Sequence, residues 1–251
     1  MQIRIRQMIT SKLMNIGERK FGEYCKIALV AGCSMLALAS TAQDDTSQLN
    51  TVLDIDALYS PLTSQKIHGE TALSLLRELQ TKHYSEIEID DNFSSLVFDS
   101  YLDALDGSHL YFLKEDVDQL SSYRYTLDDS LKEASVEPGF DIYNLYYKRI
   151  LERMIYAINR IENNIPEMDF TLEEHIELDR EDAPFAETVA ELDEIWRLRM
   201  KNSVLSLKLV GETDDEIKEK LSSRYRNQLS QILKTNDKDI FQTYLSTVAK
   251  A

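Results

Sequence analysis

The chain of 251 residues is strongly acidic, because 44 Asp and Glu residues against 28 Lys and Arg residues give a formal net charge of −16. Such a surface repels phosphate backbones and anionic headgroups, which argues against nucleic-acid binding and against peripheral membrane binding. Hydrophobic residues make up 43% of the chain, enough for a substantial core, whereas only 7 Gly and 4 Pro are present. Few turn-breaking residues favour long helices over a many-stranded β fold.

The N-terminal region has the pattern of an export signal. Lys20 and Lys26 precede an apolar run over residues 27–39, which has the length of a signal-peptide core and is too short to span a bilayer comfortably. Small residues follow, and cleavage is expected after Ala42 or, alternatively, after Ala39. We therefore expect residues 1–42 to be a signal peptide that directs the chain to the periplasm.

A bacterial lipoprotein signal is the rival interpretation. Val30–Cys33 matches the pattern in which the cysteine becomes acylated, but only six residues separate Lys26 from Cys33 and the apolar run continues past the cysteine. Both cysteines, Cys25 and Cys33, precede the expected cleavage site after Ala42. A chain cleaved there would have no disulfide, no zinc–thiolate site and no cysteine nucleophile.

The rest of the chain is predicted to be an all-α, irregular multi-helix bundle over residues 64–251, preceded by a polar tether over residues 43–63. Apolar residues recur at spacings of three and four, as on one face of a helix. Gly107 and Gly211 are expected to stop helices, and Thr213 to Glu216 forms a capping box. The expected helices cover residues 64–83, 91–105, 114–123, 127–134, 140–163, 188–208, 213–233 and 236–248.

The helix over residues 140–163 is expected to be central, because apolar residues cover much of its circumference. An aromatic and aliphatic stripe runs along it, which we interpret as core and not as a ligand site; its members are Tyr143, Tyr147, Ile150, Met154, Ala157 and Ile161. Glu137-Pro138-Gly139 is expected to end the preceding helix over residues 127–134. Residues 164–186, which contain Pro166 and Pro184, are expected to be a long connector at which the bundle could subdivide.

No catalytic, cofactor-binding or metal-binding residue is predicted. The four histidines, His68, His83, His109 and His175, are scattered, and none has a partner at ligand spacing on a helix face. His109 follows a helix end, where capping or a buried hydrogen bond is the ordinary role. No serine lies in a GxSxG turn or another glycine-rich turn, and no glycine-rich loop could hold a phosphate.

Pairs of acidic residues are interpreted as helix caps and solvated surface, and not as paired catalytic carboxylates. Carboxylates near a helix start interact favourably with the helix dipole, whereas acid–base catalysis needs two carboxylates in one cleft with different environments. The pairs are Asp90-Asp91, Asp128-Asp129, Glu173-Glu174 and Asp214-Asp215.

Several segments, taken in order, resemble the N-terminal region of the carboxy-terminal processing (tail-specific) serine proteases of the periplasm. These segments occur in the family's order over roughly residues 64–251. No single segment is specific to the family, but the ordered series is. The segments are Phe98–Asp106 with His109 and Tyr111–Leu113, then Phe140–Leu145, then Met168–Phe170, Leu178–Arg180, Ala183–Phe185 and Leu192–Trp196, and finally Leu205–Leu209 with Thr213 and Arg224-Tyr225.

In that family a helical domain precedes a PDZ domain and a protease core with a Ser–Lys dyad, in which the neutral lysine is the base for the serine. The resemblance implies that the partners of this chain are those two domains, protein substrates of the cell envelope selected by apolar C-terminal tails, and a lipoprotein adaptor. The PDZ domain would capture the tail by strand addition. No position of this chain matches the dyad motifs, so no catalytic residue is transferred to it.

The resemblance predicts a fragment that ends before the PDZ domain and is inactive alone, and DNA downstream of Ala251 should then encode the PDZ and Ser–Lys segments. The first alternative is a free-standing periplasmic helical module or adaptor that binds a partner through an apolar groove. The second alternative is a hydrolase with an unrecognised site.

The export signal predicts the mass of the mature chain. We expect mass spectrometry of protein purified from an exporting host to find an N-terminus at Gln43 or at Ser40, without lipid, because signal peptidase cleaves after small residues. An N-terminus at Cys33 that carries lipid would refute soluble export in favour of a lipoprotein.

Overall fold

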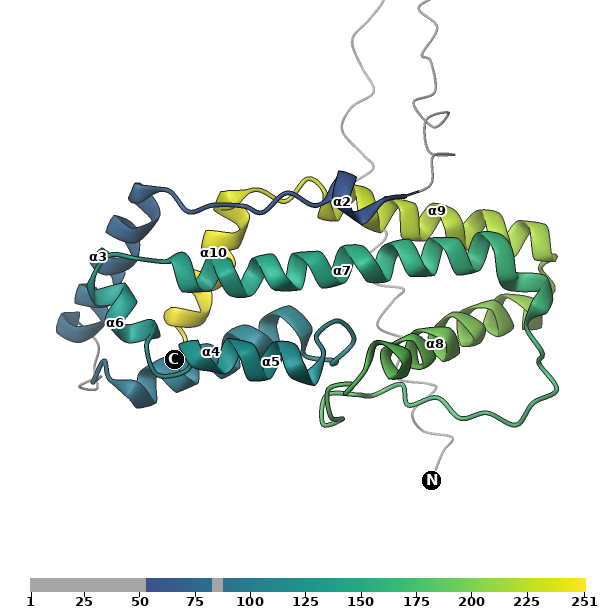
Figure 1. Ribbon diagram of the computed structural model, residues 1–251, viewed down its shortest axis with the longest axis horizontal. Helices are drawn as coiled ribbons and strands as arrows, with labels where there is room; N and C mark the ends of the chain where they lie inside the picture. The colour runs from purple at the N-terminus through teal and green to yellow at the C-terminus, as the bar shows by residue number, and fades with distance from the viewer. Residues whose placement is uncertain (1–52, 83–87) are drawn as a thin grey trace, which may run out of the picture. The chain divides into compact units, whose positions relative to one another are not determined.

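Helices dominate the computed structural model, which describes residues 53–82 and 88–251 (Figure 1). Within these ranges the only extended pairing is an isolated parallel bridge between Leu113 and Ala186, so the all-α prediction is confirmed. No helix in these ranges has the length and apolarity to cross a membrane. The α-helices are α2 (Ile55–Leu58), α3 (Lys66–Lys82), α4 (Asp91–Asp106), α5 (Lys114–Leu120), α6 (Leu127–Lys132), α7 (Glu137–Asn164), α8 (Val189–Leu209), α9 (Asp214–Ile232) and α10 (Asp237–Val248).

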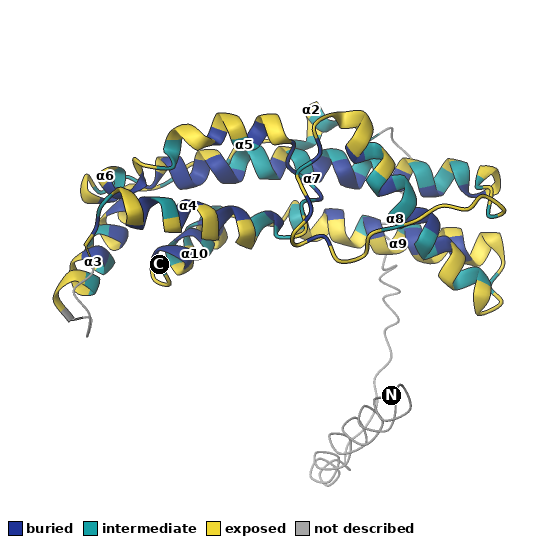
Figure 2. Ribbon diagram, turned by 90° about the horizontal axis from the view of Figure 1, so that it is seen from below, coloured by how far each residue is buried: buried dark blue, intermediate teal, exposed yellow. Residues whose placement is uncertain are grey.

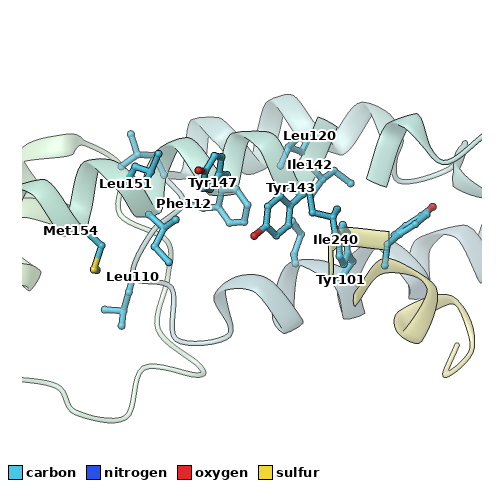
Figure 3. Packing of buried hydrophobic residues seen from close by; sticks show 14 of the residues in the cluster. Tyr101, Leu110, Phe112, Leu120, Ile142, Tyr143, Tyr147, Leu151, Met154 and Ile240 are labelled. Atoms are coloured by element: carbon cyan, nitrogen blue, oxygen red, sulfur yellow. The ribbon is translucent and has the colours of Figure 1, made fainter. Parts of the chain in front are cut away.

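The 28-residue helix α7 is the centre of the bundle, as its apolar circumference predicted. It contacts α2, α6, α8, α9 and α10, with the largest contact to α9. All six residues of its predicted stripe are buried. Figure 3 shows Tyr143, Tyr147, Leu151 and Met154 of α7 directed toward core residues from other segments, among them Phe112. In Figure 2, buried residues accordingly lie along α7 and on the sides of the neighbouring helices that face it.

The preceding helix α6 ends at Lys132, before Glu137-Pro138-Gly139, but this tripeptide is the first turn of α7, which therefore begins three residues earlier than predicted. Proline is tolerated there because the first backbone N–H groups of a helix have no intrahelical acceptor. Gly139 has a packing role, since a Cβ at this position would lie 2.7 Å from ring atoms of Tyr244 in α10. Glycine thus permits close approach of α10 to α7.

The described part of the predicted tether, residues 53–63, also differs from expectation, because it packs along α7. Leu53, Ile55, Leu58, Tyr59 and Leu62 contact the core. The Asn144 side chain fixes this segment, since its Oδ1 accepts from the Leu62 N–H at 2.9 Å and its Nδ2 donates to the Leu62 carbonyl at 2.9 Å. The sequence did not reveal that the apolar residues of this segment contact the core, because the segment as a whole is polar in composition. The predicted signal peptide, with Cys25 and Cys33, lies outside the described residues.

The connector between α7 and α8 contains one short 3-10 turn, Ile165–Glu167, and no further helix. Helices α8 and α9, which follow the connector, pack on α7, which precedes it. Gly107 ends α4 as predicted. Gly211 follows α8 with a φ of 94°, and the capping box of Thr213 and Glu216 begins α9.

Helix α3 approaches the end of α6 so closely that only glycine fits at one position. A Cβ on Gly69 would lie 1.7 Å from the carbonyl oxygen of Ala134, which has a left-handed φ of 59°. Because the obstacle is backbone, a side chain at Gly69 can be accommodated only if the two helices separate.

Replacing Gly69 with alanine should therefore destabilise the domain, although alanine normally stabilises a helix relative to glycine by roughly 1 kcal/mol. We expect the free energy of unfolding in urea to fall by about 1–3 kcal/mol, the usual cost of overpacking. Ser74→Ala, at an exposed position of the same helix, is the control and should leave stability nearly unchanged. An unfolding free energy that rises in Gly69→Ala would show that α3 does not pack on Ala134 in this way.

Candidate functional site

The described histidines occupy three separate structural positions and do not form a site. His68 is 5% exposed and lies between the rings of Phe140 and Phe241. His109 has its Nδ1 against the carbonyl oxygen of Ala183, which confirms the expected hydrogen bond at a helix end. His175 lines a small cavity beside α8, and His83 lies outside the described residues. Within those residues no group of three or more His, Cys, Asp or Glu side chains could hold a metal ion.

The acidic pairs are structural, in two ways that the sequence did not distinguish. Asp90 caps α4 by accepting from the N–H groups of Asn92 and Phe93 at 3.0 and 3.1 Å, and these bonds, led by that from Phe93, lower the pKa of its carboxyl. Glu174 is not at a helix start, contrary to expectation. It pairs with Lys201 and Arg197 of α8, and these two hydrogen bonds lower its pKa.

The second and fourth acidic pairs lie at helix starts, as predicted, and each includes a residue paired with lysine. Asp128 in the first turn of α6 is only 2% exposed, and its Oδ2 accepts from Lys132 Nζ at 2.6 Å. Asp214 in the first turn of α9 pairs with Lys208 at the end of α8. Each of these two carboxylates therefore has a lysine as its ion-pair partner.

A buried carboxylate at the end of α4 organises the loop that follows. Asp106 is 2% exposed and accepts three backbone N–H groups, from Leu110 at 2.7 Å, Tyr111 at 2.9 Å and Phe112 at 2.8 Å. Burial raises the pKa of this carboxyl, and the three hydrogen bonds oppose that rise. The loop over residues 107–113 is thus held by one side chain from within the bundle.

This loop connects the N-terminal helices to the connector and to α8. Trp196 of α8 donates from Nε1 to the Leu110 carbonyl at 2.7 Å, and the His109 ring lies 3.8 Å, between centroids, from the ring of Phe185. The Lys114 N–H donates to the Ala186 carbonyl at 2.9 Å. The loop after α4 is therefore fixed to a distant part of the chain, the end of the connector and the first half of α8.

Two open surfaces are present among the described residues, and only the second adjoins these fixed segments. The first, which we call the α8 apolar surface, consists of Leu172, Leu205, Leu209 and Val210. Leu172 and Leu205 line one cavity of 110 Å³, and Leu209 lies one turn beyond Leu205 on α8. Leu209 and Val210 are 78% and 74% exposed. Exposed apolar side chains that adjoin one another indicate a surface that another molecule or domain covers.

The second surface, which we call the α5 groove, is a hollow of 540 Å³ between α5 and the end of the connector. Val117, Pro184 and Phe185 supply its apolar part, and charged side chains surround them. Its remaining lining residues are Lys114, Asp118, Glu187 and Glu191. The sequence did not indicate this groove, because its two sides are about 70 residues apart.

The described helical bundle thus presents two open surfaces, one apolar and one that combines apolar and charged residues. Residues 75–251 match the family described as the tail specific protease N-terminal domain. The chain therefore belongs to that family, in agreement with the resemblance found in the sequence. It is 35% identical over 195 residues to the tail-specific protease of Haemophilus influenzae, an alignment that covers 76% of this chain and 28% of that protein.

The three hydrogen bonds accepted by Asp106 predict that replacing this residue has both a local and a global effect. In Asp106→Ala the buried N–H groups of Leu110 and Phe112 and the partly buried one of Tyr111 lose their acceptor. Each buried group left unpaired costs about 1–3 kcal/mol, so we expect at least about 2 kcal/mol less unfolding free energy. Hydrogen exchange at Leu110, Tyr111 and Phe112 should accelerate. Asp103→Ala, an exposed position one turn earlier in α4, is the matched control. Equal stability of the two variants would contradict the proposed role of Asp106.

Proposed function

We propose that this chain is the helical N-terminal domain of a periplasmic serine endopeptidase that processes exported or cell-envelope proteins selected by their C-terminal tails. Family membership supports the proposal, as does the similarity to a protein named as a tail-specific protease. The chain spans only 28% of the length of that relative. The activity and its substrates would therefore belong to a longer protein.

In this proposal the helical domain takes no part in the chemistry. A PDZ domain and a protease core with a Ser–Lys dyad would capture and cleave the tail, and a lipoprotein adaptor would bring substrates to the enzyme. The apolar run over residues 27–39 supports export to the periplasm. The helical domain supplies rigid surfaces against which the other parts of the enzyme pack.

The α8 apolar surface is the observation that carries this proposal. Leu209 and Val210 leave most of their area in water, although burial of such side chains is worth about 1.5–3 kcal/mol each. We infer that the remainder of the protease covers them. A partner within the same polypeptide is favoured over a separate one because the curated relative is much longer than the chain.

A chimeric enzyme tests this role. Residues 53–251 would replace the matching segment of the Haemophilus influenzae protease, and cleavage of an unfolded reporter with an apolar C-terminal tail would be measured. The chimera should cleave the reporter, and the chain alone should not. Leu209→Asp combined with Val210→Asp should reduce cleavage by about tenfold or more, because the new carboxylates would be buried without partners.

Ile67→Asp is the control for this experiment, since Ile67 is 57% exposed and lies in α3, outside the α8 apolar surface. It should leave cleavage by the chimera unchanged. Equal cleavage by the Leu209/Val210 double variant and the Ile67 variant would refute docking through α8. Cleavage by the purified chain alone would refute a non-catalytic role.

A further inference from the structure

We propose that the α5 groove binds a protein segment in which an apolar side chain is flanked by lysine or arginine. The inference does not depend on the proteolytic role, because it rests on the shape and charge of the groove alone. The ligand class follows from three properties of the groove: its apolar floor, its uncompensated carboxylates and its fixed walls.

The apolar floor sets the first requirement of the ligand. Val117 and Phe185 are half-buried and Pro184 is exposed, and all three line the same hollow of 540 Å³. This volume lies within the range of about 300–1,000 Å³ that is typical of ligand sites. It accommodates an apolar side chain together with its adjacent backbone, so the partner should present such a residue.

The charges around the floor set the second requirement. Lys114 and Asp118 neutralise each other, with Lys114 Nζ 3.1 Å from Asp118 Oδ2. The Glu187 side chain has no hydrogen bond or ion pair with any described residue, and Glu191 accepts only from the Glu187 N–H, at 2.9 Å. Two carboxylates therefore remain without a cation. They attract a basic segment and repel an acidic one, and the net charge of −16 acts in the same direction.

The walls of the groove are held before any ligand arrives. On the α5 side, Arg149 donates to both carboxylate oxygens of Asp116 at 2.8 Å, and Asp116 accepts from the Leu113 N–H at 2.9 Å. On the connector side, the Ala186 carbonyl accepts from the Lys114 N–H and the Phe185 ring contacts His109. A site with fixed walls loses little conformational entropy on binding.

Peptide binding to the full chain tests the inference. Three short fluorescein-labelled peptides would be compared by fluorescence anisotropy: one of alternating lysine and leucine, one with glutamate in place of lysine, and one with serine in place of leucine. The lysine–leucine peptide should bind about tenfold or more tightly than either of the others. Added salt should weaken its binding without abolishing it, because the apolar contact is not screened.

Two charge-reversal variants locate the site. Glu187→Lys should weaken binding of the lysine–leucine peptide about fivefold or more, and it should fold normally because its side chain has no partner to lose. Glu173→Lys makes the same charge change at an exposed position of the same connector and should change affinity by less than about twofold. Circular dichroism would verify that both variants are folded.

Three results would overturn the inference. Equal weakening by Glu187→Lys and Glu173→Lys would assign binding to the diffuse negative charge of the surface. Equal affinity for the leucine and serine peptides would show that the apolar floor does not contribute to recognition. Tightest binding of the glutamate–leucine peptide would show that the groove carboxylates do not select the ligand.

Discussion

The structure depends on burial of a single helix. Apolar residues occupy so much of the circumference of α7 that no single neighbour could cover it, and helices from both before and after it in the chain pack around it. Tyr143, Tyr147 and Met154 each meet a different part of this surrounding layer (Figure 3). The hydrophobic effect therefore draws the N-terminal and C-terminal helices into one bundle, although a long connector separates them. The α3–α6 contact at Gly69 and the α7–α10 contact at Gly139 then determine how closely the helices approach.

Hydrogen bonds to buried polar groups position the segments that apolar packing alone would leave free. Asp106 holds three successive N–H groups of the loop after α4, and Trp196 attaches the same loop to α8. Unpaired buried N–H groups are costly, so this loop has one favoured conformation. The α5 groove adjoins segments fixed in this way, which makes it suitable for recognition.

The two surfaces differ in chemistry and so suit different partners. The α8 apolar surface exposes Leu209 and Val210 and suits permanent burial within a larger protein. The α5 groove combines a small apolar floor with the carboxylates of Glu187 and Glu191, which have no cation partner among the described residues, and this combination suits a short basic segment. A domain with both surfaces would combine a lasting interface with a selective one.

The sequence by itself determined the family and most of the helices, although not α2 or the first turn of α7. Helical spacing, the Thr213 capping box and the stops at Gly107 and Gly211 are local features, and each depends on residues within a few positions of one another. Only the tertiary structure decided which distant segments those helices contact. It showed that Gly139 allows Tyr244 to pack, that Asp106 is buried, that residues 53–63 lie along α7, and that Val117 and Phe185 share a groove. These contacts join segments far apart in the chain, and the period of a single helix carries no information about which distant segment will cover it.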